Sequence, residues 1–261
     1  MPNEGKRVAL VTGATRGIGL AVTRTLAAQG HKVFLCARDA DAVELTVKQL
    51  RNEDLEVDGT SCDVRSAEEI TACVHAAVEA FGPIDVLVNN AGRSGGGVTA
   101  DLDDELWFDV LNTNLNSVFL MTRAVLNIGG MREKDRGRII NIASTAGKQG
   151  VVLAAPYSAS KHGVVGFTKA LGNELAPTGI TVNAVCPGYV ETSMAQRVRQ
   201  GYAAAFETTE EAILEKFQAK IPLGRYSTPE EVAGMVGYLA SDTAASVTAQ
   251  AINVCGGLGN F

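Results

Sequence analysis

Short apolar runs alternate with amphipathic stretches along most of the chain. Continuous apolar runs bounded by glycine turns are typical of buried parallel strands, and apolar positions three or four residues apart are typical of helices. The runs predict strands at residues 7–12, 32–38, 56–63, 83–92, 138–143, 180–186 and 250–254. Helices are predicted between them, at residues 20–29, 40–53, 67–81, 106–122, 156–176 and 229–239. The alternation predicts a single α/β domain over residues 1–261, with a parallel sheet covered by helices on both faces.

The alternation is interrupted between Ser193 and Ile221, where two helical pieces follow each other. An insertion at the carboxyl edge of a parallel sheet is a natural lid over a substrate pocket. We therefore expect residues 193–221 to form a helical lid. Some of its apolar side chains can either line the pocket or pack on the body of the domain: Met194, Tyr202, Phe206 and Phe217.

The first strand runs into a glycine-rich turn that opens a helix, with the spacing Thr12-Gly13-x-x-x-Gly17-x-Gly19. Glycines let the backbone approach a pyrophosphate, and the N-terminus of the following helix offers free N–H groups to it. Other cofactor contacts are expected at the carboxyl ends of the strands, where such sheets bind their ligands. The expected cofactor-binding residues are Thr12, Gly13, Thr15, Arg16, Gly17, Ile18, Gly19, Arg38, Asp63, Val64, Asn90, Ala91, Gly92, Tyr157, Lys161, Pro187, Gly188, Val190 and Thr192.

The end of the second strand favours NADP(H) over NAD(H). A cofactor with a free ribose 2′-hydroxyl usually meets an acidic residue there, but this chain has Arg38, followed by Asp39. Together with Arg16 in the glycine turn, Arg38 offers guanidinium groups that suit a 2′-phosphate. The alternative is that Arg38 is only a solvated loop charge.

Asp63 ends the third predicted strand, and two roles are open for it. At the carboxyl end of the strand, its carboxylate can accept a hydrogen bond from an adenine amino group. It can equally cap the helix that starts near Ser66.

Ser144, Tyr157 and Lys161 form the candidate catalytic group. Pro156 is predicted to start a helix, so Tyr157 and Lys161 share one helix face, and Ser144 ends a buried strand. Three such groups can surround one carbonyl oxygen during hydride reduction of a ketone, with Tyr157 giving the proton. Free tyrosine has a pKa near 10, and an ammonium group about 4 Å away lowers it by roughly 3 units. The alternative is that the pair belongs to an ordinary exposed helix face.

Asn114 lies inside the predicted helix at residues 106–122. A polar side chain in an apolar helix usually satisfies a local backbone group. Asn114 can instead hold a water molecule that returns protons to Lys161.

Composition narrows the class of protein. A formal charge of -6 and a pI of about 5.2 argue against a general role in binding nucleic acid or a membrane surface. No apolar run reaches the roughly 20 residues of a membrane span, and the first residues lack the apolar core of a secretory signal. The cysteines are odd in number and have no metal-ligand spacing, so we expect reduced thiols, no metal and a cytoplasmic location. They are Cys36, Cys62, Cys73, Cys186 and Cys255.

Together these motifs resemble the short-chain dehydrogenase/reductase family over the whole chain. The matching pieces are Thr12-Gly13-x-x-x-Gly17-x-Gly19, Asn89-Asn90-Ala91-Gly92, Asn114, Ser144, Tyr157-x-x-x-Lys161 and Pro187-Gly188. The resemblance implies a seven-stranded Rossmann fold, a homotetramer, and a catalytic tetrad of Asn114, Ser144, Tyr157 and Lys161.

Residues 93–97, 143–152, 157–172 and 253–260 look like the actinorhodin-type ketoreductases of aromatic polyketide synthases. This resemblance implies NADPH-dependent reduction of one ketone, at carbon 9, of a polyketide intermediate held on acyl carrier protein. It also implies substrate contacts from Ser94, Gly95, Gly96, Ser144, Thr145, Gln149, Val151, Leu153, Met194 and Tyr202. The chain departs from the subfamily at Ser94, which replaces a proline tied to product stereochemistry, and at Lys220, which replaces an arginine at the lid entrance.

Arg38, Arg65 and Arg93 follow the second, third and fourth predicted strands, so all three should lie on the same edge. An acidic partner would meet a local basic patch there, on a chain that is otherwise negative. We therefore expect acyl carrier protein to dock on it. The alternative is that a cofactor phosphate occupies Arg38 and that the other two are solvated.

Two other functions are alternatives to the hypothesis of a polyketide ketoreductase. A 3-oxoacyl-[acyl-carrier-protein] reductase of fatty-acid synthesis has the same chemistry, and the pocket beside Ser94-Gly95-Gly96 would distinguish it. A catalytically silent NADP(H)-binding regulatory protein belongs to another class, and the complete tetrad argues against it.

Overall fold

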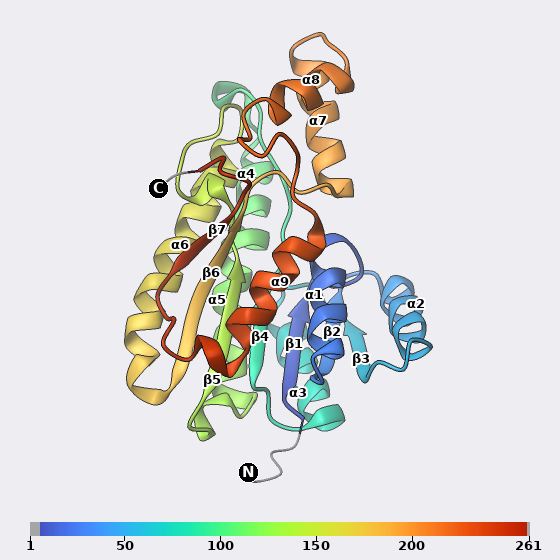
Figure 1. Ribbon diagram of the computed structural model, residues 1–261, viewed down its shortest axis with the longest axis vertical. Coiled ribbons are helices and arrows are strands. Elements are labelled where there is room, and N and C mark those ends of the chain that lie inside the picture. The colour runs from blue at the N-terminus through green and yellow to red at the C-terminus, as the bar shows by residue number, and fades with distance from the viewer. Residues whose placement is uncertain (1–5, 260–261) are drawn as a thin grey trace.

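The computed structural model describes residues 6–259, which contain one seven-stranded parallel sheet (Figure 1). The strands are β1 (Val8–Thr12), β2 (Lys32–Ala37), β3 (Val57–Ser61), β4 (Val86–Asn89), β5 (Gly137–Ile142), β6 (Ile180–Pro187) and β7 (Ala251–Val254). Their spatial order is β3-β2-β1-β4-β5-β6-β7. The order reverses between β1 and β4, and open α/β sheets bind ligands at the carboxyl ends of the strands at such a point.

Helices cover both faces of the sheet, which confirms the predicted fold. They are α1 (Gly17–Ala28), α2 (Ala40–Arg51), α3 (Ala67–Phe81), α4 (Asp104–Leu111), α5 (Ser117–Ile128), α6 (Ala155–Leu175), α7 (Ser193–Ala205), α8 (Glu210–Gln218) and α9 (Pro229–Ala240). Short 3₁₀ turns lie at Thr99–Asp101, Met131–Glu133, Thr145–Gly147, Ala176–Thr178 and Asp242–Ala244. One hydrophobic core lies between the sheet and α1, α2 and α9, and a second lies between the sheet and α3, α5 and α6. None of the described helices is long and apolar enough to cross a membrane.

Strand β1 shows why both faces need helices. All of its residues are buried, and successive side chains of a strand point to opposite faces. Ala9 and Val11 belong to the core under α1, α2 and α9, whereas Val8 and Leu10 belong to the core under α3, α5 and α6. Each fully buried Val or Leu contributes about 1.5–3 kcal/mol, so a strand that is apolar on both faces requires two helical layers.

Polar side chains fix the starts of several helices. Asp39 accepts a hydrogen bond from Ala42 N (3.1 Å) at the start of α2, and Ser66 accepts one from Glu69 N (3.2 Å) at the start of α3. The cap of α3 is therefore Ser66. The reading of Asp63 as this cap is wrong, because the Ser66 hydroxyl already satisfies the first turn.

The predicted helix at residues 106–122 is two helices in the structure. A π-helical turn, Asn112–Asn116, separates α4 from α5. Such turns occur mostly as single turns inside α-helices, often at functional sites. The apolar pattern of the sequence does not reveal this π-helical turn, because a single wider turn hardly changes which positions are apolar.

The predicted interruption at residues 193–221 forms α7 and α8, beyond the carboxyl edge of the sheet at the top of Figure 1. The two helices share a small core built from Ala203, Ile213, Phe217, Ile221 and Tyr226. Phe217 is buried there, Phe206 is exposed, and Met194 and Tyr202 are half-buried. Phe217 therefore packs within the insertion and does not line a pocket.

Candidate active site

Ser144 and Tyr157 meet at the carboxyl end of β5. The Ser144 hydroxyl accepts a hydrogen bond from Ala146 N (3.1 Å), and the side chain is buried. Tyr157 lies in the first turn of α6, and its phenol is near enough to the Ser144 hydroxyl for that hydroxyl to lower the pKa of the phenol. The structure thus brings together two groups that are thirteen positions apart in the chain.

Lys161 lies one turn further along α6 and is almost fully buried. Its Nζ donates a hydrogen bond to Ile142 O (2.8 Å) and lies 5.8 Å from the centroid of the Tyr157 ring. Burial lowers the pKa of Lys161 to about 8, because the ammonium form loses its solvation.

The expectation that the Lys161 ammonium makes the Tyr157 phenol unusually acidic is wrong for the chain alone. Burial raises the pKa of Tyr157 above its usual value, and the hydrogen bond from Ser144 offsets this only in part. Both charged forms lose solvation in the same buried place, so burial outweighs the attraction between them. The site therefore presents a neutral phenol, which is the form that can donate a proton.

Asn114 fixes the loop after β4. It is fully buried; its Oδ1 accepts a hydrogen bond from Arg93 N (2.8 Å), and its Nδ2 donates to Arg93 O (3.0 Å) and Ser160 Oγ (3.1 Å). A Cβ added to Gly92 would lie 3.3 Å from Asn114 Oδ1 and 3.7 Å from Lys161 Nζ, so these three residues adjoin. The reading in which Asn114 satisfies its own helix backbone is wrong, because the π turn directs the side chain to a distant loop.

The loop after β4 also makes hydrogen bonds to the glycine-rich turn. Gly13 and Gly17 have φ values of +65° and +54°, a region that glycine enters without strain. Asn90 Nδ2 donates to Thr12 O (2.8 Å) and Gly13 O (3.0 Å), and Thr12 Oγ1 accepts from Asn90 N and Ala91 N. A Cβ added to Gly13 would lie 2.9 Å from Ala91 Cα, so only glycine fits.

The start of α1 fits an anion. Among the described residues, no side chain caps its first turn, and that turn carries no acidic residue. Helices α2, α3, α4, α7, α8 and α9 all have a side-chain cap. The free N–H groups and the helix dipole therefore suit the pyrophosphate of a dinucleotide. Thr192 borders the same place, since a Cβ added to Gly17 would lie 3.3 Å from Thr192 Cγ2.

Arg16 and Arg38 are both exposed at this edge. The acidic residue nearest the end of β2, Asp39, directs its carboxylate at the first turn of α2. Hydrogen bonds from Arg65 and, more weakly, the charge of Arg38 lower the pKa of Asp63. Two guanidinium groups beside the glycine turn fit a 2′-phosphate better than a free 2′-hydroxyl.

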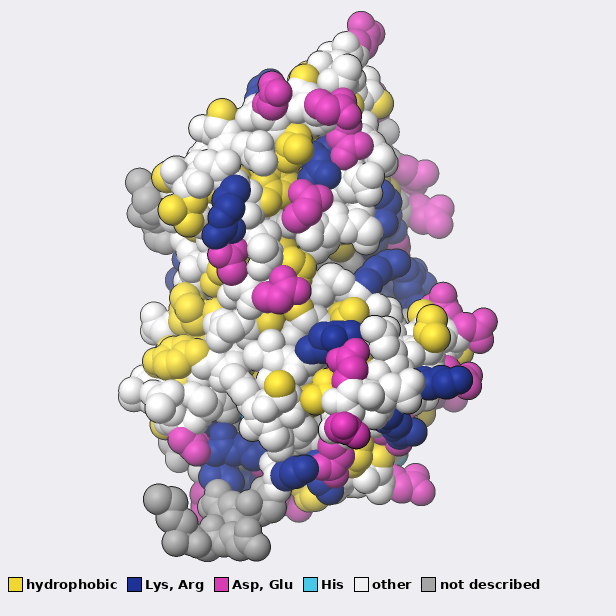
Figure 2. All heavy atoms as spheres, turned by 45° about the vertical axis from the view of Figure 1, so that its right-hand side comes forward, with side chains coloured by type: hydrophobic (Ala, Val, Ile, Leu, Met, Phe, Trp, Pro, Cys, Tyr) yellow, Lys and Arg dark blue, Asp and Glu magenta, His cyan; other side chains and the backbone are white. Residues whose placement is uncertain are grey.

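Arg65 and Arg93 meet around an acidic residue that sequence analysis missed. Asp109 of α4 pairs with Arg65 Nη1 (2.7 Å) and with Arg93. Arg65 also donates to Asp63 from Nε (3.0 Å) and Nη2 (2.6 Å). Two arginines and two aspartates carry no net charge, so the expected basic patch is largely an ion-pair cluster. Figure 2 likewise shows basic and acidic side chains interspersed on the face it presents.

The loop after β4 and the loop before α6 touch through their backbones. Gly97 N donates to Leu153 O (2.9 Å), and a Cβ added to Gly96 would lie only 1.9 Å from that oxygen. Leu153 has a φ of +58°, which costs a non-glycine residue about 1–3 kcal/mol. The Tyr202 hydroxyl donates to Val152 O, so α7 joins the same rim directly before Tyr157.

The other expected substrate residues lie along this rim or beside it. Ser94, Gly95, Gln149, Val151 and Met194 are half-buried, Thr145 is buried next to Ser144, and Lys220 is exposed after α8. Lys220 Nζ lies 5.4 Å from the centroid of the Phe217 ring, so its side chain rests on the core of the insertion.

The remaining expected cofactor residues also lie at the carboxyl edge. They are Thr15, Ile18 and Gly19 at the start of α1, Val64 after β3, and Pro187, Gly188 and Val190 at the end of β6 and just beyond it. A Cβ added to Gly19 would lie 2.3 Å from Gly13 O, and one added to Gly188 would lie 2.9 Å from Cys255 Cβ. Neither position has room for a Cβ, so neighbouring protein atoms require glycine at both positions, whatever the cofactor needs.

The chain belongs to the short-chain dehydrogenase family. The family model, described as short chain dehydrogenase, matches residues 7–203. The match includes the glycine-rich turn and the group of Asn114, Ser144, Tyr157 and Lys161. Members of this family are oxidoreductases that use a nicotinamide cofactor, and the resemblance found in the sequence is confirmed.

Three known proteins show where the chain lies within the family. It is 78% identical over 261 residues, 100% of both chains, to a protein of Streptomyces virginiae named as a ketoacyl reductase of the monensin polyketide synthase. It is 39% identical over 255 residues, 98% of both chains, to the 3-oxoacyl-[acyl-carrier-protein] reductase of Vibrio cholerae. A solved structure of an actinorhodin polyketide ketoreductase variant with NADPH has a TM-score of 0.96 and 62% identity, with 98% of both chains covered.

Proposed function

We propose that this protein is an NADPH-dependent ketoreductase that reduces one ketone of a polyketide intermediate on acyl carrier protein. The observation that carries the proposal is the group formed by the buried Ser144 and Lys161 and the half-buried Tyr157. The loop after β4 connects this group to the glycine-rich turn before the uncapped start of α1. The high identity to proteins named as polyketide ketoreductases supports the substrate class. Reduction at carbon 9 is part of the proposal and rests on the resemblance to actinorhodin-type enzymes.

The proposed chemistry follows from the protonation states of these groups. When bound, the cofactor supplies a hydride to the ketone carbon. Tyr157 donates its proton to the ketone oxygen, since its raised pKa keeps the phenol protonated at neutral pH. Ser144 holds the same oxygen by a hydrogen bond, which stabilises the negative charge that develops on it. Lys161 is charged below a pH of about 8 and stabilises the phenolate that remains.

We propose that Asn114 acts by holding other groups of the site in place. Its three hydrogen bonds hold the Gly92–Arg93 backbone beside Lys161. Only one hydrogen bond to Asn114 Oδ1 is present among the described residues, which leaves a lone pair for a water molecule. Such a water would return a proton to Lys161 after each turnover.

The NADP(H) preference is supported by Arg16 and Arg38, together with the engagement of Asp39 as a helix cap. An assay with NADPH and NADH on the bicyclic ketone trans-1-decalone tests both cofactor and substrate. We expect good turnover with NADPH and at least about tenfold lower kcat/KM with NADH, which corresponds to about 1.4 kcal/mol of phosphate recognition. Strict preference for acetoacetyl thioesters over the decalone would instead indicate a fatty-acid 3-oxoacyl reductase.

Tyr157→Phe provides the control for catalysis in this assay. Removing a general acid typically lowers the rate about 10²–10⁴-fold, while NADPH binding, followed by nicotinamide fluorescence, should persist. A wild-type protein that binds NADPH but reduces neither ketone would identify a regulatory protein and contradict the proposal.

Docking of acyl carrier protein at Arg38, Arg65 and Arg93 remains part of the proposal, as do a homotetramer and a cytoplasmic location. The three arginines follow the ends of β2, β3 and β4 at the carboxyl edge, and Arg93 adjoins the rim formed by the loops around Ser94 and Leu153. A carrier docked there would deliver its substrate over a short path to Tyr157.

The tetramer follows from the family resemblance, and light scattering on the purified protein measures it directly.

A further inference from the structure

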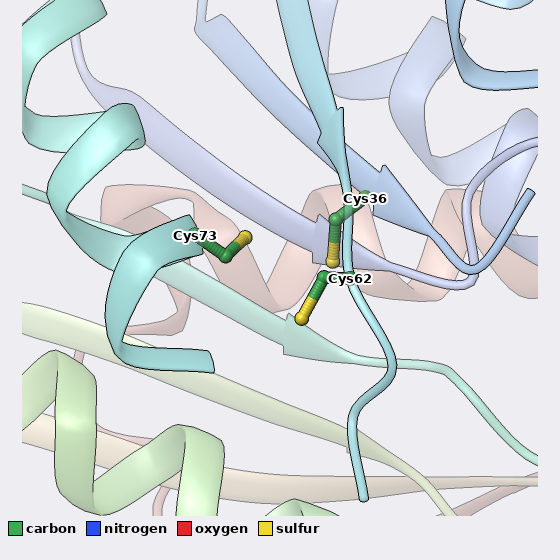
Figure 3. Close-up of side chains that lie close together, drawn as sticks. All are labelled: Cys36, Cys62 and Cys73. Atoms are coloured by element: carbon green, nitrogen blue, oxygen red, sulfur yellow. The ribbon is translucent and has the colours of Figure 1, made fainter. Parts of the chain in front are cut away.

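Three cysteines from separate elements converge in the core between the sheet and α3 (Figure 3). Cys36 lies in β2, Cys62 directly follows β3, and Cys73 lies in α3. Their Sγ atoms all lie within 4.8 Å of one another. The side chains are at most 1% exposed, and apolar residues of the same core surround them.

The sulfur separations are close to those around a single ion. Three sulfurs in one plane, each about 2.3 Å from a central ion, lie about 4.0 Å apart. Small rotations of the three side chains therefore bring the sulfurs from their present separation to a coordinating one. Three buried cysteines can also pack simply as small apolar residues. This group differs from scattered core cysteines because its three sulfurs come from separate elements and still lie within 4.8 Å of one another.

We propose that Cys36, Cys62 and Cys73 form a three-coordinate site for a soft monovalent ion, Cu(I). Thiolate ligands select soft ions such as Cu(I), whereas a structural Zn²⁺ site almost always has four ligands. Among the described residues, no His, Asp or Glu side chain completes this group as a fourth ligand. The proposal is independent of the proposed reductase activity.

Binding changes no oxidation state. The cysteine sulfurs donate electron pairs to the ion, and the thiol protons that are displaced pass to solvent. Cys62 directly follows β3, and its neighbours Ser61 and Asp63 are exposed and half-buried, so the turn after β3 offers a short path from solvent to the site. Opening of the turn after β3 would admit the ion.

The site would connect the ion to the cofactor-binding half of the sheet. Cys62 N donates to Ala37 O (2.8 Å), and Cys36 O accepts a hydrogen bond from Ala14 N (3.2 Å) in the glycine-rich turn. An ion held by all three cysteines would fasten β2, the turn after β3 and α3 to one another beneath that turn. We therefore expect bound Cu(I) to raise the Tm of the protein.

The test is an anaerobic titration of the reduced full chain with Cu(I) held by bathocuproine disulfonate. We expect the protein to remove one equivalent of copper from the chelator, with a sulfur-to-copper charge-transfer band. Cys73→Ala should weaken this transfer at least about 100-fold, because it removes a ligand and not merely an outer partner. Cys255→Ala removes another buried cysteine, outside the cluster, and should leave the transfer unchanged.

X-ray absorption at the copper edge of the unmodified chain decides the matter even if Cys73→Ala does not fold. Three sulfur neighbours support the proposal. Absence of copper transfer, a two-sulfur site, or equal transfer by Cys73→Ala would each overturn it. Preferential binding of Zn²⁺ with a nitrogen or oxygen ligand would overturn the assignment of the ion.

Discussion

Burial acts on Tyr157 and Lys161 in opposite directions at the residue scale. It raises the pKa of the phenol and lowers that of the lysine, because each group is driven toward its neutral form. In ketone reduction Tyr157 has to donate a proton. A raised pKa suits this role, because it keeps the phenol protonated before the reaction. A small change in pH near neutrality alters the protonation of Lys161 more than that of Tyr157, because the pKa of Lys161, about 8, lies close to physiological pH.

Replacing Lys161 with Met should raise the free energy of unfolding at pH 7. Unfolded lysine keeps its ordinary pKa of 10.5, so below pH 8 the folded protein carries a buried ammonium that costs about 3 kcal/mol. This cost falls as the pH rises from 8 to 10.5, because the folded protein has then released the proton. The stability gained by Lys161→Met, measured by urea unfolding, should therefore shrink over that range.

Lys169→Met serves as the matched control for this experiment. Lys169 is an exposed residue of the same helix, α6, so its replacement should change stability little at either pH. A stability difference between wild type and Lys161→Met that stays constant between pH 7 and pH 10 would contradict the assigned pKa.

At the scale of elements, most of the fold could be predicted from the apolar pattern. Strands with two apolar faces and a glycine turn before α1 leave few alternatives to a doubly covered parallel sheet. The π turn at Asn112–Asn116 could not be predicted, because no local pattern distinguishes it from α-helix. The partners of Asn114, namely Arg93 and Ser160, were missed for the same reason, since only the folded chain brings them together.

The arrangement of α7 and α8 depends on one buried side chain. Arg199 of α7 is 6% exposed; it donates from Nη1 and Nη2 to Glu191 (both 3.0 Å) and from Nε to Glu210 (3.0 Å). These contacts tie α7 to the chain before it and to the start of α8. Glu191 is itself exposed, so the cluster is anchored mainly by the buried guanidinium.

Arg199→Met should loosen α7 and α8 without unfolding the sheet. Breaking a buried ion pair costs about 3–5 kcal/mol locally, so hydrogen exchange in residues 193–221 should accelerate by roughly two orders of magnitude or more. The KM for a bulky bicyclic ketone should rise, since α7 contacts the rim at Val152. Arg197→Met, at an exposed position of the same helix, is the control. Unchanged exchange in Arg199→Met would show that the aromatic core alone holds α7 and α8 in place.

At the scale of the whole molecule, the net charge of -6 poses a problem for an acidic partner. The sequence indicated a basic patch because three arginines follow neighbouring strands. It could not show that Asp63 and Asp109 neutralise two of them, since Asp109 comes from α4 in a different part of the chain. A carrier protein docked at this edge would have to displace or share these ion pairs, which are partly exposed and individually weak.

Reversal of Arg65 and Arg93 to Glu tests this docking. Two acids in place of the arginines leave Asp63 and Asp109 unpaired, so an acidic carrier should be repelled. We expect the apparent KM for a carrier-bound substrate to rise at least about tenfold, and that for free trans-1-decalone to stay unchanged. Arg51→Glu combined with Arg132→Glu, both away from the carboxyl edge, makes the same change in net charge and is the control. Equal effects of the double reversal on both substrates would refute docking.

The π turn between α4 and α5 behaves as a single-residue insertion in an otherwise continuous helix. Deleting one residue from Asn112–Asn116 would let the two helices fuse, with every backbone bond in its ordinary place. Because each residue of an α-helix advances by about 100°, the deletion would swing α4 around the axis and carry Asp109 away from Arg65 and Arg93. The same rotation would move Val110, which is fully buried in α4, so the length of this segment sets both the packing of α4 and the side chains that reach the two arginines.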